Sequence, residues 1–181
     1  MSANCFIRLL ASTRGAAVVE MALVAPVLAL GVIGIVDISN AYSKKLALEQ
    51  GAQRAIEKIM NTTETSTVEA TLANEAVCQV NGTTTSGGVT TCNSTPITTS
   101  NVTVTWRLDC TTGATTTSQT TTSSTTYDTY VAACVSPSKP TGYVQVTVTD
   151  KYTPLFPIHF AAFNTSDSTY HLSATAGTRT M

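Results

Sequence analysis

Charged side chains are scarce in this sequence, and their scarcity argues against several classes of partner. Only 12% of the residues are charged, and the formal net charge is −1. No basic run provides the positive field that attracts nucleic acid or an anionic membrane surface. Apolar residues are concentrated before Val36, while Thr, Ser and Gly dominate the remainder. We therefore expect no nucleic-acid partner and a chain whose two parts lie in different solvents.

Histidine and the patterns of catalytic or metal sites are also rare. The two histidines are His159 and His171, and no C-x-x-C or H-x-x-x-H spacing occurs. This argues against a zinc site. No nucleophile-elbow motif occurs, and no Gly-rich phosphate loop follows a predicted strand. Composition alone leaves room for a Ser-His-Asp arrangement that uses Asp150. We expect no metal, no cofactor and no enzymatic activity, and keep an enzyme as the third hypothesis.

One long apolar segment dominates the N-terminal part. No residue from Met21 to Val36 is charged, and Glu20 is the only ionisable group when the segment is extended back to Ala16. As a helix, these roughly 21 residues measure about 30 Å, the thickness of the hydrocarbon core of a bilayer. We predict a transmembrane helix over residues 16–38.

Positive charge marks the N-terminal side of this segment. Arg8 and Arg14 precede it, whereas Lys44 and Lys45 follow only beyond Asp37. The positive-inside rule therefore predicts a cytoplasmic N-terminus and places everything after the span on the other side of the membrane.

Two ordinary processing fates are compatible with the segment. The small residues of Ser39-Asn40-Ala41 offer a signal-peptidase site, and cleavage there would release a soluble protein that begins at Tyr42. An uncleaved membrane anchor would instead keep Met1.

A third fate rests on the stretch RGAAVVE, in which Gly15 follows an arginine and Glu20 is the fifth residue after the glycine. This pattern resembles the type IV prepilin signal. The resemblance implies a leader over residues 1–15, cleavage after Gly15 by a peptidase on the cytoplasmic side, and retention of the helix in the membrane.

The chemistry of these residues fits the prepilin hypothesis. Gly15 has no Cβ, so an extended backbone can lie close to a protease. Cleavage would make Ala16 the new N-terminus, and the carboxylate of Glu20 could then meet the positive end of the helix or the amine of a neighbouring subunit. A charge within lipid is costly, which favours such pairing. Pro26 removes one helical hydrogen bond and should kink the helix. We expect assembly contacts at Glu20 and Pro26.

Helical periodicity continues beyond the span. Apolar residues recur at helical spacing at Leu48, Ala52, Ala55, Ile56 and Ile59. This predicts a helix extension over residues 39–62 that is broken at Asn61-Thr62-Thr63. Gly51 would let another element approach closely.

A second, shorter helix is predicted within residues 66–78. Ser66 and Glu69 have the spacing of a capping box, and Val68, Leu72, Ala76 and Val77 form an apolar stripe. The alternative is an irregular Thr-rich linker.

Strand patterns follow in the C-terminal part. Apolar and polar residues alternate over residues 101–109 and 143–152, and more weakly over 168–176, while 127–135 is a fourth candidate strand. The Thr-rich segments 81–96 and 111–126 are predicted to be loops at the exposed end. We expect an α+β fold in which residues 63–181 form a head with a helix packed on an antiparallel sheet.

The cysteines agree with a head outside the cytoplasm. Cys5 lies in the predicted leader, which leaves an even set for the head: Cys78, Cys92, Cys110 and Cys134. In an oxidising compartment these would form two disulfides. Three connectivities are open, and pairing in sequence order is weakly preferred.

The stretch RGAAVVEMALVAPVLALGVIGIVDISNAY, with EQGAQRAIE after it, is similar to the N-terminal region of TadE-like proteins. The C-terminal VQVTVTDKYTPLFPIHF and YHLSATAGTR are more weakly similar to that family's closing part. The family comprises minor pilins or pseudopilins of the bacterial tight-adherence (Flp) pilus system.

The resemblance implies a structural role in a pilus used for surface attachment. The chain would be a single-pass protein of the inner membrane with a periplasmic head, and it could enter an extracellular pilus. Its partners would be prepilin peptidase, other pilins, inner-membrane assembly proteins and lipid. TPLFPIHF, with Leu155, Phe156, Ile158 and Phe160, is a candidate contact surface, unless this turn folds onto the head's own core.

The alternative hypothesis for function is a secreted or membrane-anchored, disulfide-stabilised binding module with no pilus role. The mature N-terminus distinguishes the two. Ala16 favours the pilin hypothesis, and a soluble product that begins at Tyr42 favours the alternative.

Overall fold

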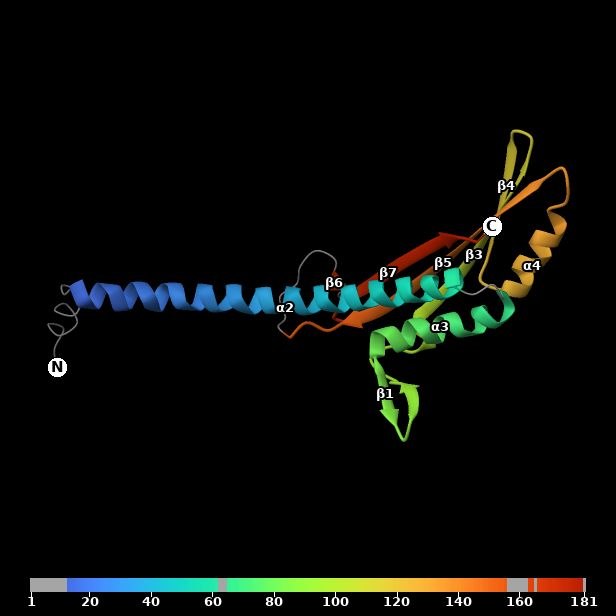
Figure 1. The fold of residues 1–181 in the computed structure, drawn as a ribbon. Helices are drawn as coiled ribbons and strands as arrows, with labels where there is room; N and C mark the ends of the chain where they lie inside the picture. The colour runs from blue at the N-terminus through green and yellow to red at the C-terminus, as the bar shows by residue number, and fades with distance from the viewer. Residues whose placement is uncertain (1–12, 62–64, 156–162, 165, 181) are drawn as a thin grey trace.

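The computed structural model describes residues 13–61, 65–155, 163–164 and 166–180 and has an α+β fold (Figure 1). A single long helix, α2 (Thr13–Asn61), runs from the N-terminal end into the head. Its C-terminal part lies along the head's sheet, whereas its N-terminal part extends beyond it. The predicted fold class is confirmed.

Helix α2 combines two kinds of surface. The predicted stripe is buried in the core at Leu48, Ala52, Ala55 and Ile56, with Ile59 packed against it. The helix is continuous through Pro26 and ends at Asn61, where the sequence predicted its end. The same helix is therefore apolar and exposed in its first half and amphipathic in its second.

Helix α3 (Thr65–Asn81) packs on α2 and confirms the second predicted helix. Leu72, Ala76 and Val77 are buried, as the stripe required. The side chains of residues 65–70, including the expected capping box, lie outside the described part. At the helix pair's outer side, Glu75 of α3 accepts hydrogen bonds from Arg54 Nε (3.2 Å) and Lys58 Nζ (3.4 Å) of α2.

Five strands form the main antiparallel sheet in the order β4-β3-β5-β7-β6. Their bounds are β3 Val102–Thr112, β4 Thr115–Thr121, β5 Lys139–Tyr152, β6 Phe163–Asn164 and β7 Thr169–Arg179, and the short helix η1 (Thr99–Asn101) leads into β3. In register, Val146 of β5 lies opposite Val104 of β3 and Ala176 of β7. The three main strand predictions are confirmed.

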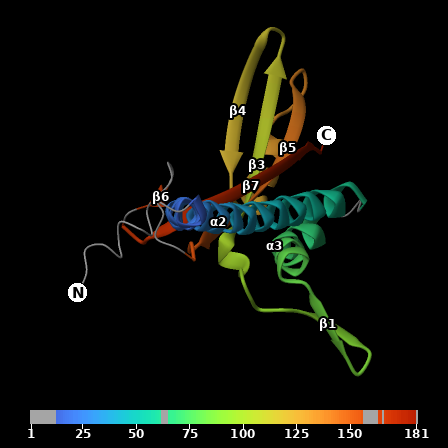
Figure 2. The same ribbon diagram turned by 90° about the vertical axis from the view of Figure 1, so that its left-hand side faces the viewer.

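The core lies between this sheet and the two helices. Alternate residues of β3 and β5 point into it, among them Trp106, Leu108, Val144, Val146 and Val148. Helix α2 contacts β5 and β7, while α3 contacts β3 (Figure 2). Because successive side chains point to opposite faces of a sheet, the intervening polar residues face solvent.

The strand predicted over residues 127–135 is wrong, because this segment forms helix α4 (Ser124–Ala133). Ser123 caps the helix by accepting a hydrogen bond from the Thr126 backbone (3.4 Å). The buried Tyr127 places its ring 5.4 Å from that of Trp106, and Tyr130, Val131 and Cys134 also pack against the core. This is a helical spacing of three and four residues, which overrides the strand propensity of aromatic and β-branched residues.

The two Thr-rich segments also differ from the predicted loops. The first contains a hairpin of β1 (Thr83–Ser86) and β2 (Val89–Cys92), which turns at Gly87 and Gly88, both with positive φ. The second contains β4, which pairs with β3 across a turn at Gly113. Threonine is β-branched and suits strands, so these chains gain backbone hydrogen bonds although their side chains stay exposed.

The four cysteines of the head pair in sequence order. Cys78 of α3 joins Cys92 at the end of β2, with a Cα separation of 4.8 Å. Cys110 of β3 joins Cys134, the C-terminal cap of α4, at 5.9 Å. Each disulfide ties a peripheral element to an element that contributes to the core.

The close approach of α2 and α3 at Gly51 yields the first prediction. A Cβ atom there would lie 2.5 Å from Val80 Cγ2 and 3.0 Å from the Ala76 carbonyl oxygen. Overpacking a well-packed core costs ~1 to 3 kcal/mol. We expect Gly51→Leu to lower the head's stability by about that much in urea unfolding followed by the fluorescence of Trp106.

Gly34→Leu is the matched control, since a Cβ at Gly34 meets nothing within 4 Å in the described structure. Equal stability of the Gly51 and Gly34 variants would contradict the packing argument.

Candidate functional site

The first half of α2 is apolar on every side and exposed. It is long and apolar enough to cross a membrane, and only 11% of its most apolar window is buried inside the protein. Its exposed large apolar residues are Val18, Val19, Met21, Leu23, Val24, Val27, Leu28, Leu30, Val32, Ile35, Val36 and Ile38. A core helix of a soluble protein would bury such residues, so this surface requires lipid or other apolar partners.

The residues expected at the processing site lie on the first turns of this helix. Gly15 and Ala16 fall within the helical range, and Glu20 and Pro26 follow with exposed side chains. Among the described residues, Glu20 forms no hydrogen bond or ion pair. Its carboxylate is the only charged group on the helix between Arg14 and Asp37.

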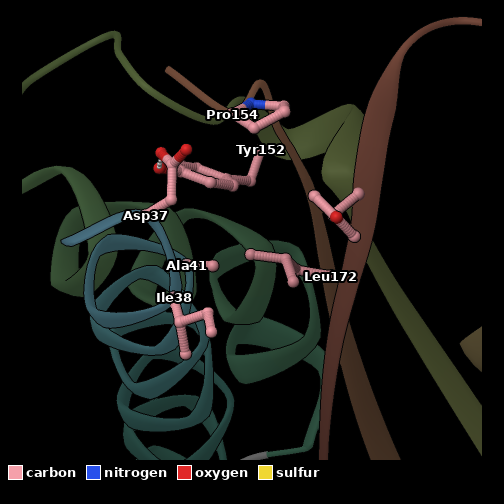
Figure 3. Close-up of a pocket in the computed structure, with 7 residues that line it drawn as sticks. Asp37, Ile38, Ala41, Tyr152, Pro154 and Leu172 are labelled. Atoms are coloured by element: carbon pink, nitrogen blue, oxygen red, sulfur yellow. Dashed lines mark hydrogen bonds between the residues drawn. The ribbon is translucent and has the colours of Figure 1, made fainter. Parts of the chain in front are cut away.

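A buried contact joins the end of this apolar segment to the head. Asp37 is only 6% exposed, and its Oδ1 accepts a hydrogen bond from the hydroxyl of Tyr152 (2.8 Å) and another from the backbone N–H of Leu155 (2.9 Å). Tyr152 is the last residue of β5 and is 7% exposed. Figure 3 places the carboxylate of Asp37 beside the ring of Tyr152.

The electrostatics keep Tyr152 a hydrogen-bond donor. Burial raises the pKa of its hydroxyl, and the hydrogen bond to the Asp37 carboxylate raises that pKa further. A phenolate beside a buried carboxylate would place two negative charges together, so the neutral phenol is retained.

A second contact lies two helical turns further along the same face of α2. Lys44 Nζ is 3.3 Å from Asp150 Oδ2 of β5 and 5.8 Å from the centre of the Tyr152 ring. Residues seven apart lie on one face of a helix, so Asp37 and Lys44 hold the same strand end. We call these four residues, Asp37, Lys44, Asp150 and Tyr152, the helix-to-sheet clamp.

An apolar cavity of about 370 Å³ lies beside the clamp. Ile38 and Ala41 line it from α2, Tyr152 and Pro154 from β5 and the residues after it, and Tyr170 and Leu172 from β7 (Figure 3). The cavity therefore sits where the apolar half of the helix meets the head. Of the predicted contact surface, Leu155 is exposed, whereas residues 156–162 lie outside the described part.

The two histidines were not expected to take part in catalysis. His159 lies outside the described residues. His171 Nε2 is 2.7 Å from Asp167 Oδ2, which Lys151 Nζ approaches at 2.8 Å. The hydrogen bonds from Lys151, His171 and Thr169 lower the pKa of Asp167. Through Lys151, this cluster holds the turn before β7 against β5. In the part of the chain that the structure describes, no three metal-ligating side chains gather.

The clamp was not predicted from the sequence. Asp37 was noted only for its charge, although a carboxylate at the end of an apolar span signals a group that needs partners. Its partners are more than a hundred residues away in sequence, and no local pattern connects them.

The clamp yields the second prediction. Replacing Asp37 by alanine removes the acceptor from a buried donor, the Tyr152 hydroxyl, at a cost of about 1–3 kcal/mol, and from the part-buried Leu155 N–H. We expect Asp37→Ala to lower the unfolding stability of the full chain in detergent more than Tyr152→Phe, which removes one donor and leaves Asp37 bound to the Leu155 N–H.

Asp128→Ala removes an exposed carboxylate from α4 and is the control. A stability loss for Asp37→Ala no larger than that of Asp128→Ala would mean that the clamp does not hold the helix to the head.

Comparison with known proteins finds a match for a segment of helix α2. Residues 15–56 match the family model described as TadE-like protein, which confirms the resemblance over this segment. The match begins at Gly15, covers the apolar half of α2 and ends within the buried stripe. No curated protein and no solved structure matches the chain.

Proposed function

We propose that this chain, which carries a TadE-like segment at residues 15–56, is a minor pilin or pseudopilin of a tight-adherence pilus. In this role it takes part in the assembly, priming or tip formation of a fibre used for surface attachment. Pilus-system proteins of this family are structural rather than catalytic, and a structural subunit needs surfaces that bind lipid first and other subunits later.

The observation that carries the proposal is the bare apolar half of α2. It continues without interruption into a helix that is fixed to a folded head. In the membrane, lipid would cover this surface. In a fibre, the corresponding helices of other subunits would replace the lipid, so one surface serves both states.

The carboxylate of Glu20 would determine how neighbouring helices align in these contacts. Cleavage after Gly15 would create an amine at Ala16, one helical turn from the carboxylate. Between two subunits, such an amine and Glu20 could form an ion pair inside an apolar environment, where an unpaired charge is costly. Pro26 lies further along the same exposed helix and is a second expected assembly contact.

We infer a single-pass arrangement in the bacterial inner membrane, with the N-terminus in the cytoplasm and the head in the periplasm. The arginines before the span support this orientation. The two cysteine pairs of the head fit an oxidising compartment. The partners would be prepilin peptidase, other pilins and inner-membrane assembly proteins.

The clamp argues against release of a soluble head that begins at Tyr42. Cleavage after Ala41 would remove Asp37, which binds the end of β5, while leaving Lys44 in place. The released head would keep Tyr152 with no carboxylate to accept its hydrogen bond. Retention of the helix therefore suits the fold better than its loss.

The third prediction concerns the mature N-terminus. Mass spectrometry of the membrane-extracted chain should find Ala16 as the first residue. We expect Gly15→Val to abolish this cleavage, because a β-branched side chain next to the scissile bond obstructs the protease. Gly34→Val, which makes the same change at an open position of the same helix, should be cleaved normally.

A mature chain that starts at Tyr42 would overturn the pilin proposal and favour a secreted binding module. An intact Met1 would leave a plain membrane anchor.

The fourth prediction concerns Glu20. We expect Glu20→Ala to be cleaved but to enter sheared pili about tenfold less than the unchanged chain, a loss of ~1.4 kcal/mol in assembly. Glu57→Ala, which removes an exposed carboxylate near the end of α2, should assemble normally. Equal incorporation of both variants, measured by quantitative immunoblot of the pilus fraction, would show that Glu20 has no part in assembly.

A further inference from the structure

The solvent-facing side of the sheet contains a hollow of about 530 Å³ at the end far from the clamp. Its volume lies within the range of small-molecule sites. The side chains that matter for its chemistry are Thr105, Arg107, Tyr143, Gln145 and Arg179, with Gly177 beside them. None of the residues that line it is acidic.

The strand register explains why these residues meet. Arg107 of β3 lies opposite Tyr143 of β5, which in turn lies opposite Arg179 of β7. Neighbouring strands are about 4.8 Å apart, so the two arginines stand roughly 10 Å apart with the phenol between them. Long side chains at that spacing can reach one ligand.

The next row of the register forms the hollow itself. Thr105 lies opposite Gln145, and Gln145 lies opposite Gly177. Gly177 has no side chain to cover the sheet surface beside Arg179, and a Cβ atom there would lie 3.1 Å from the Val144 carbonyl oxygen.

Arg107 is held in place before any ligand arrives. Its Nε and one terminal nitrogen donate to the two carboxylate oxygens of Asp109, at 2.8 and 3.0 Å, and its guanidinium lies 5.8 Å from the centre of the Tyr143 ring. The hydrogen bonds from Arg107 and Ser118 lower the pKa of Asp109. Arg107 and Arg179 thus bring two guanidinium groups to this end of the sheet, in a chain whose net charge is −1.

We propose that this hollow binds a saccharide that carries carboxylate groups. Arg179 and the outer edge of the Arg107 guanidinium would hold the carboxylate through charge-assisted hydrogen bonds. The hydroxyl of Thr105 and the amide of Gln145 would form hydrogen bonds with the sugar hydroxyls, since both groups donate and accept hydrogen bonds. The ring of Tyr143, 38% exposed, offers a flat apolar surface for the sugar ring.

The lining favours a saccharide over an acidic peptide. Hydroxyl, amide and phenol groups surround the arginines, and such groups match the ring hydroxyls of a sugar. The inference goes beyond the proposed pilus role and does not depend on it, because ligand binding can be measured without assembly.

The test is calorimetric titration of the full chain in detergent micelles with tetragalacturonate at an ionic strength of about 0.15 M. Its fully methyl-esterified form is the matched ligand, with the same rings and no charge. We expect the acid to bind and the ester not to bind measurably. Arg179→Gln should weaken binding about tenfold, the effect of losing one charge-assisted contact.

Lys45→Gln is the matched control, because it removes one positive charge from an exposed position on α2. It should bind within about twofold of the unchanged chain, since an exposed charge more than a Debye length away is largely screened. Urea unfolding followed by Trp106 fluorescence verifies that both variants fold.

Three results would overturn the inference. The first is the absence of measurable binding by tetragalacturonate. The second is an equal loss of affinity in Arg179→Gln and Lys45→Gln, which would mean attraction by overall charge. The third is tighter binding of tetraglutamate than of tetragalacturonate, which would assign the hollow to an acidic peptide.

Discussion

The carboxylate of Asp37 is the constraint on which the rest of the structure depends. It is buried where an apolar helix reaches the head, and Tyr152 and the Leu155 backbone stabilise it there by donating hydrogen bonds to it. Buried charges need such partners, so the end of β5 must sit at this position on α2. This contact thus joins the helix that would lie in lipid to the sheet that forms the head.

Local patterns predicted the elements that bury an apolar face. The stripe from Leu48 to Ile56 indicates within a few residues which side of the helix must be buried. The alternation of Val144, Val146 and Val148 does the same for a strand. The Thr-rich segments carry no such signal, because both faces of β1, β2 and β4 stay exposed. Their strands depend on pairing with a partner, and the helix α4 depends on the contact between Tyr127 and Trp106.

The same division applies to the candidate sites. Gly15 and Glu20 form a local pattern, so the sequence alone pointed to a prepilin-type start, and the family match begins at the same glycine. The clamp joins Asp37 to Tyr152, which is 115 residues away in the sequence, and the hollow needs the register of three strands. Contacts of this kind follow from the folded sheet, and no spacing in the sequence encodes them.

Strand β5 links the two ends of the head. Tyr152 binds the helix at one end, and Tyr143 lies in the hollow nine residues earlier, about 30 Å away at ~3.3 Å per residue. Because β5 is paired on both sides, this distance is held by hydrogen bonds along most of its length. A helix fixed in a membrane or in a fibre would therefore also fix the direction in which the hollow faces. The apolar half of α2 would pack against lipid or other subunits, whereas the hollow at the other end of the head would face outward. Strand β5 connects these two regions.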